Sequence, residues 1–126
     1  MTDLFKDIAD FHKKFDLTPN EKPGHLELPL SIFRTDFMRE EIDEYENAAC
    51  RDNLEGEFDA LIDLVYVALG TAYLHGFDFN EGWKRVHEAN MKKVKAQNKR
   101  ESKRNSIYDV VKPEGWVAPD LSDLCK

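Results

Sequence analysis

Cysteine is scarce in the sequence, and neither cysteine is placed to bind a metal. Cys50 and Cys125 are the only two, and they do not form a Cys-x-x-Cys pair. Two cysteines are too few for the disulfide framework of a small secreted domain. A zinc site would need a cluster of cysteines or histidines at ligand spacing, which the sequence also lacks. We therefore expect two free thiols and a cytoplasmic protein.

The sequence also has no long uninterrupted apolar run. Charged residues interrupt the first twenty positions, which argues against a secretory signal peptide. The most apolar stretch, residues 58–74, is slightly short for a membrane span and contains two aspartates. With 41% hydrophobic and 34% charged residues, the composition is typical of a soluble globular protein. We expect one domain over residues 1–126.

The sequence has fewer basic than acidic residues, except in one segment. The formal net charge is −7, so we expect neither nucleic acid nor a membrane surface as a partner. Residues 92–104, however, hold seven basic residues and one acidic residue. This run is either a solvated helix end or a source of cations for an anionic ligand, and the sequence leaves both interpretations open.

Apolar spacing and turn residues predict four helices and a tail. The helices are expected over about fifteen residues after an N-cap at Thr2, then over about 29–50, 55–74 and 80–95. Four helices joined by short loops predict an all-α, four-helix-bundle-like fold. Its helical core would cover about residues 2–95, and residues 96–126 would form an extended tail anchored by Trp116.

Two glutamates stand on or beside the apolar face of the second predicted helix. The register set by Leu30, Phe33 and Phe37 continues at helical spacing to Glu41 and Glu44. An acidic run such as residues 40–46, considered alone, is more typical of a solvated helix surface. The third helix changes this interpretation.

Asp59 and Asp63 have apolar neighbours on every side in the third predicted helix. Rotating this helix cannot expose both aspartates without also exposing Phe58, Ile62 or Tyr66. A buried carboxylate without a partner is costly, and the helix offers no cation of its own. A divalent cation would resolve the charge problem, because Mg²⁺ and Mn²⁺ prefer oxygen ligands.

Histidine motifs do not support a different metal centre. A di-iron carboxylate bundle needs Glu-x-x-His motifs. The residues three positions before the four histidines are Ala9, Lys22, Ala72 and Lys84. The motif is therefore absent.

The order of these acidic residues resembles a known family. Glu40-Glu41-x-x-Glu44, followed by an acidic pair on the next helix, resembles the MazG-like branch of the all-α nucleoside triphosphate pyrophosphohydrolases. This branch includes phosphoribosyl-ATP pyrophosphohydrolase and dimeric dUTPase. Three stretches are similar to its small phage and bacterial members: DALIDLVYVALGTAYLHGFD, VHEANMKKV at 86–94 and KPEGWVAPDL at 112–121. The family usually places Glu-x-x-Asp on the third helix, whereas here Ala60 stands three before Asp63 and Asp59 lies one place earlier.

The resemblance implies Mg²⁺-dependent hydrolysis of a nucleoside triphosphate or related nucleotide between the α and β phosphates, with Mn²⁺ as a possible substitute. The implied metal ligands are Glu41, Glu44, Asp59 and Asp63, with Asp59 bound directly or through water. Glu40 or Glu41 would accept the proton of the attacking water. The implied substrate contacts are Arg34, Asn90 and Lys93.

The resemblance also implies a homodimer or homotetramer whose bundles share a core. Two alternatives remain open. The chain could be a non-catalytic nucleotide- or metal-binding helical module, or a structural bundle with a paired polar core.

Overall fold

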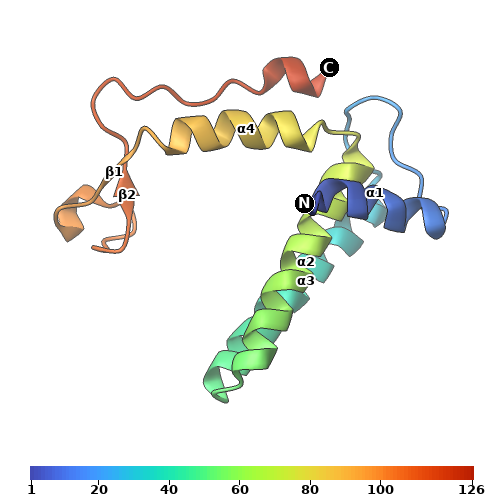
Figure 1. Cartoon of the computed structure of the whole chain (residues 1–126), viewed down its shortest axis with the longest axis horizontal. Coiled ribbons are helices and arrows are strands. Elements are labelled where there is room, and N and C mark those ends of the chain that lie inside the picture. The colour runs from blue at the N-terminus through green and yellow to red at the C-terminus, as the bar shows by residue number, and fades with distance from the viewer. The chain divides into compact units, whose positions relative to one another are not determined.

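The structure is a computed structural model of residues 1–126, and it has two compact units (Figure 1). Unit 1 comprises Met1–Phe79 with Leu124–Lys126, and unit 2 comprises Asn80–Asp123. Four helices account for most of the regular structure, and the two strands have two residues each. The predicted all-α class is confirmed. The expectation of a single domain with a core over about residues 2–95 stays a prediction.

Unit 1 contains three helices: α1 (Leu4–Lys14), α2 (Leu28–Cys50) and α3 (Leu54–His75). α2 and α3 lie side by side as a long antiparallel hairpin, and α1 packs against α3 (Figure 1). The predicted N-cap of the first helix is wrong by one residue. Asp3, not Thr2, accepts a hydrogen bond from the Lys6 amide at 3.1 Å.

Local capping residues fix both ends of α3. Asn53 accepts a hydrogen bond from the Gly56 amide at 3.0 Å, which satisfies one of the free amides at the helix start. At the other end Gly76 has φ of 82°, the left-handed conformation of a C-cap glycine. The loop after α1 lies against this end, because the amides of Asn20 and Gly24 donate to Leu74 and His75. The predicted helix end near His75 and Gly76 is confirmed.

The core of unit 1 is small for helices of this length. Its buried apolar side chains are Ile8, Ala48, Ala60, Val67, Leu69 and Leu74. Many large apolar side chains of α3 are exposed, including Phe58 at 66% and Ile62 at 48%. By length and composition α3 could cross a membrane, which is weak evidence because core helices of soluble proteins meet the same criteria.

Unit 2 consists of most of α4 (Phe79–Asn90), the strands β1 (Val94–Lys95) and β2 (Val110–Val111), and two short 3₁₀ segments, Lys99–Glu101 and the start of Ser122–Cys125. The fourth helix is expected to reach about residue 95, but α4 ends at Asn90, so the predicted end is wrong. β1 pairs antiparallel with β2, Val94 opposite Val111, so the backbone of residues 94 and 95 is extended instead of helical.

The tail is held against α4 at two points. The indole Nε1 of Trp116 donates to the carbonyl of Ala89 at 2.7 Å, as expected of a tail anchored by its tryptophan. Arg85 on α4 forms a two-point bridge with the Asp123 carboxylate, at 2.6 and 3.1 Å. It also donates to the Asp120 carbonyl at 3.0 Å.

Candidate metal and catalytic site

Three acidic side chains from α2 and α3 converge in unit 1. One carboxylate oxygen each from Glu41, Glu44 and Asp63 lies within 4.8 Å of the other two. Glu41 and Glu44 are three residues apart on α2 and so share one side of that helix. Asp63 faces them because α3 runs back along α2. We call these three residues the carboxylate cluster.

Burial and mutual repulsion make the carboxylate cluster costly to ionise. Glu41 is only 5% exposed, and its Oε2 is buried without a hydrogen-bond partner. Burial raises the pKa of Glu41 to about 7, aided by a hydrogen bond and repulsion from Glu44 and by the charge of Asp63. Burial also raises the pKa of Asp63, with further contributions from Asp59 and Glu44. The cluster thus has excess negative charge that the protein does not neutralise.

Asp59 and Glu40 lie outside the carboxylate cluster. Both are exposed, contrary to the expectation that Asp59 would be buried. Their charges nevertheless act on the cluster, because Asp59 raises the pKa of Asp63 and Glu40 that of Glu41. Asp59 is exposed because Phe58, Ile62 and Tyr66 beside it are exposed too. As the sequence indicates, Asp59 is not exposed without its apolar neighbours. No other part of the chain covers that side of α3.

Arg34 lies inside unit 1 and joins α2 to α3. Its Nε donates to the Thr71 hydroxyl at 3.1 Å, and its Nη2 donates to the Val67 carbonyl at 2.9 Å. The side chain has no ion pair, although the residue is only 8% exposed. Desolvation lowers the pKa of Arg34. It is a buried cation that no carboxylate of the chain neutralises.

Two residues that support Arg34 were not identified from the sequence. A Cβ on Gly70 would lie 2.7 Å from the Arg34 Nη2 and 3.1 Å from the His12 Cε1, so glycine leaves the room that both side chains occupy. The His12 Nδ1 donates to the Ile8 carbonyl at 2.7 Å, and its Nε2 is buried without a partner. The sequence signal that could have identified this contact is Gly70 itself. A lone glycine within an otherwise strong helix pattern often marks close packing.

The other two predicted substrate contacts belong to unit 2. Asn90 is the last residue of α4 and is exposed. The Lys93 ammonium lies over the Trp116 ring, 5.2 Å from its centroid. Their contact with a substrate stays a prediction.

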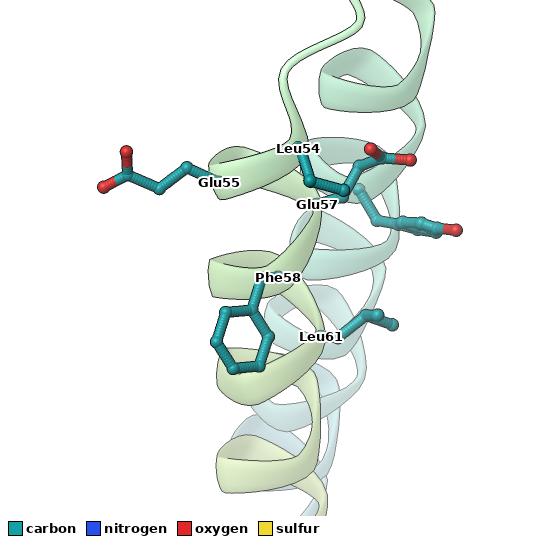
Figure 2. A pocket seen from close by; sticks show the side chains of 6 residues that line it. Leu54, Glu55, Glu57, Phe58 and Leu61 are labelled. Carbon is teal, nitrogen blue, oxygen red and sulfur yellow. The ribbon is translucent and has the colours of Figure 1, made fainter.

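An open hollow near the α2–α3 turn is separate from the carboxylate cluster. Its lining residues are Tyr45, Leu54, Glu55, Glu57, Phe58 and Leu61. Figure 2 shows the Glu55 side chain directed away from Glu57 and Leu61, so the labelled acids do not converge there. This hollow is mainly an uncovered apolar surface and offers no second set of metal ligands.

The donor set of the carboxylate cluster fits a hard divalent cation. It supplies three carboxylate oxygens, and one buried oxygen has no other partner. Mg²⁺ is commonly held by a few carboxylates, with water and substrate phosphates completing its coordination. A bound cation would also remove the repulsion that raises the pKa values of Glu41 and Asp63.

The helical hairpin and its carboxylate cluster fit an all-α, MazG-like hydrolase, and a family comparison shows this class. The family model described as phosphoribosyl-ATP pyrophosphohydrolase matches residues 8–90. The chain belongs to this family of nucleotide pyrophosphohydrolases. A comparison with curated proteins gave no match. The family match covers the carboxylate cluster and Arg34 and ends at Asn90.

Proposed function

We propose that the protein is a Mg²⁺-dependent nucleoside triphosphate pyrophosphohydrolase that cleaves between the α and β phosphates. The products would be a nucleoside monophosphate and pyrophosphate. The carboxylate cluster is the observation that carries this proposal, because its unneutralised charge sits on helices that match a pyrophosphohydrolase family. We also propose that the protein is of the small phage or bacterial type within this family.

Each acidic residue has a distinct proposed role. Glu41, Glu44 and Asp63 hold the cation, and Asp59 contributes its charge from one helical turn away. When bound, Mg²⁺ supplies neutralisation of phosphate charge and acidification of a water molecule, and Mn²⁺ can do the same. Glu40, exposed beside the cluster, accepts the proton of the attacking water. Glu41 would be free to do so only where it does not bind the cation.

The substrate brings negative charge to an acidic protein and therefore needs cations as well. Arg34 has five N–H donors, of which α3 occupies two, and no carboxylate of the chain pairs with its charge. We therefore propose that Arg34, Asn90 and Lys93 contact the substrate. Asn90 and Lys93 lie in unit 2 and stand in the motif that resembles the family's VHxxNMxK pattern.

We further propose that the protein acts as a homodimer or homotetramer in the cytoplasm. An apolar groove between α1 and α3 is lined by Leu4, Ile8, Phe58, Leu61, Ile62, Val65, Tyr66 and Leu69, with Asp7 at its edge. Large apolar surfaces of this kind are rare on monomers and common at interfaces. A second copy covering this face would also bury the surroundings of Asp59.

A nucleotide panel tests the proposed reaction. Purified protein is incubated with Mg²⁺ and canonical and modified nucleoside triphosphates, and pyrophosphate and monophosphate are quantified. We expect at least one substrate, with kcat/KM about 100-fold lower in Glu41→Gln. Glu46→Gln changes an exposed acid on the same helix outside the cluster, so it should retain activity.

The same panel separates the enzyme from a binding module. Pyrophosphate release no higher than that of Glu41→Gln, together with retained binding of Mn²⁺, would indicate a non-catalytic metal- or nucleotide-binding module. Release of inorganic phosphate instead of pyrophosphate would contradict cleavage between the α and β phosphates.

A further inference from the structure

Unit 2 differs from unit 1 in charge. Residues 80–123 contain ten lysines and arginines and seven aspartates and glutamates, a formal charge of +3 in a chain of −7. All of this excess follows Asn90, beyond the family match. Arg85 and Arg104 are committed to ion pairs with acids of the same unit. The lysines and Arg100 carry the unpaired charge.

A tight turn places Trp116 at the end of α4. The Trp116 amide donates to the Pro113 carbonyl at 3.0 Å, and Gly115 between them has φ of 80°. This is the arrangement of a type II turn, whose third residue needs a positive φ and is usually glycine. The Trp116 indole is then fixed by its hydrogen bond to the Ala89 carbonyl. The ring therefore has a defined position relative to Lys112, just before the turn, and Lys93, just after α4.

Two ammonium groups converge on this one ring. The Nζ atoms of Lys93 and Lys112 lie 5.2 and 5.1 Å from the centroid of Trp116. The indole attracts each cation, so both ammonium groups are held next to the same ring. Neither ammonium group makes a hydrogen bond or an ion pair with the protein. Their six N–H donors are thus available to a ligand.

We propose that Lys93, Lys112 and Trp116 form a binding site for a diphosphate group. A diphosphate offers several oxygen acceptors and enough negative charge to pair with both ammonium groups. Lysine binds phosphate well as a point charge. The ring positions the ammonium groups without occupying them with a hydrogen-bond acceptor of the protein. This inference rests on the proposed function, in which the diphosphate is either the released product or the β and γ phosphates of the substrate.

Fluorescence of Trp116 can report binding directly. The chain has two tryptophans, so Trp83→Phe leaves Trp116 as the only indole. This variant of the full chain is titrated with sodium pyrophosphate in EDTA at constant ionic strength, which removes any contribution of a bound cation. Inorganic phosphate and an intact nucleoside triphosphate serve as parallel ligands. We expect saturable quenching by pyrophosphate, with inorganic phosphate much weaker. Tighter binding of the triphosphate would assign the site to the substrate, and tighter binding of pyrophosphate would assign it to the product.

Lysine variants separate a defined site from general electrostatics. Lys112→Ala and Lys93→Gln should each weaken pyrophosphate binding about tenfold, with circular dichroism confirming that the variants are folded. Lys84→Ala and Lys103→Ala remove exposed lysines of the same unit away from Trp116 and should leave the affinity unchanged. An equal loss in all four variants would overturn the site in favour of diffuse attraction. Lower thermal stability of Lys112→Ala and Lys93→Gln without a change in affinity would show that the lysines only stabilise the fold.

Failure of this site and failure of the enzymatic proposal give different results. Lysine-dependent pyrophosphate binding without hydrolysis of any nucleotide would support the site and reject the proposed reaction. Hydrolysis with unchanged pyrophosphate affinity in Lys112→Ala and Lys93→Gln would reject the site alone.

Discussion

At the scale of single residues, Glu41 has an unusual environment for a carboxylate. It is a nearly buried carboxylate with one oxygen unpartnered, and Glu44 and Asp63 lie next to it. Such a residue destabilises the fold when it is ionised without a cation. A carboxylate that costs stability in this way is typical of a functional site. The same reasoning applies more weakly to Asp63, which is half-buried.

The pH dependence of stability should reveal this cost. Because folding raises the pKa of Glu41 from 4.5 to about 7, the folded state holds more protons than the unfolded state between these values. Stability from this residue is therefore lost as pH rises through that window. In EDTA, the melting temperature of Glu41→Gln should fall less between about pH 5 and pH 8 than that of the wild type. Saturating Mg²⁺ should remove the difference, and identical slopes in EDTA would contradict the assignment.

At the scale of elements, the junction of α1, α2 and α3 depends on a single glycine. Arg34 cannot move away from Gly70 without losing its bonds to Thr71 and Val67, and the His12 ring also lies close to Gly70. This close contact links the helix that carries Glu41 to the helix that carries Asp63. The junction therefore helps to set the geometry of the carboxylate cluster.

Substituting Gly70 by alanine should destabilise the protein even though alanine favours helices. We expect Gly70→Ala to lower the free energy of unfolding by about 1–3 kcal/mol through overpacking. Gly82→Ala is the matched control, because a Cβ there meets nothing within 4 Å. It should raise stability by up to about 1 kcal/mol. Chemical denaturation measures the free energy of unfolding of both variants. A higher value for Gly70→Ala than for the wild type would contradict close packing at the junction.

Elements that depend on local residues could be predicted from the sequence, and those that depend on distant pairing could not. The ends of α3 follow from Asn53 and Gly76, which act within a few residues of their positions. The end of α4 was missed because Val94 pairs with Val111, far along the chain. The convergence of Glu41, Glu44 and Asp63 could be predicted because helical spacing puts Glu41 and Glu44 on one side of α2, and α3 runs back along it. Their role as metal ligands stays a prediction. The exposure of Asp59 was missed because it depends on what covers α3.

At the scale of the whole molecule, the uncovered apolar face of α3 is the dominant feature. Phe58, Ile62 and Val65 are each about half exposed or more, while the buried core of unit 1 is made of few side chains. Burying apolar surface is the main source of folding stability. Association of two or more chains would supply burial that one chain lacks.

Oligomerisation should therefore depend on this face. Sedimentation should show a dimer or tetramer for the wild type, and a shift towards monomer for Phe58→Glu combined with Val65→Glu, because charges cannot be buried there without partners. Val117→Glu changes an exposed apolar residue of unit 2 and should leave the assembly intact. A wild-type protein that is monomeric at micromolar concentrations would count against the proposed homo-oligomer.

Binding of a divalent cation by the carboxylate cluster is the central claim, and a Mn²⁺ titration followed by electron paramagnetic resonance tests it most directly. The account predicts that Glu41→Gln and Asp63→Asn each weaken Mn²⁺ binding at least about tenfold. Glu46→Gln should bind as the wild type does. Equal Mn²⁺ affinity in the wild type and all three variants would contradict the claim.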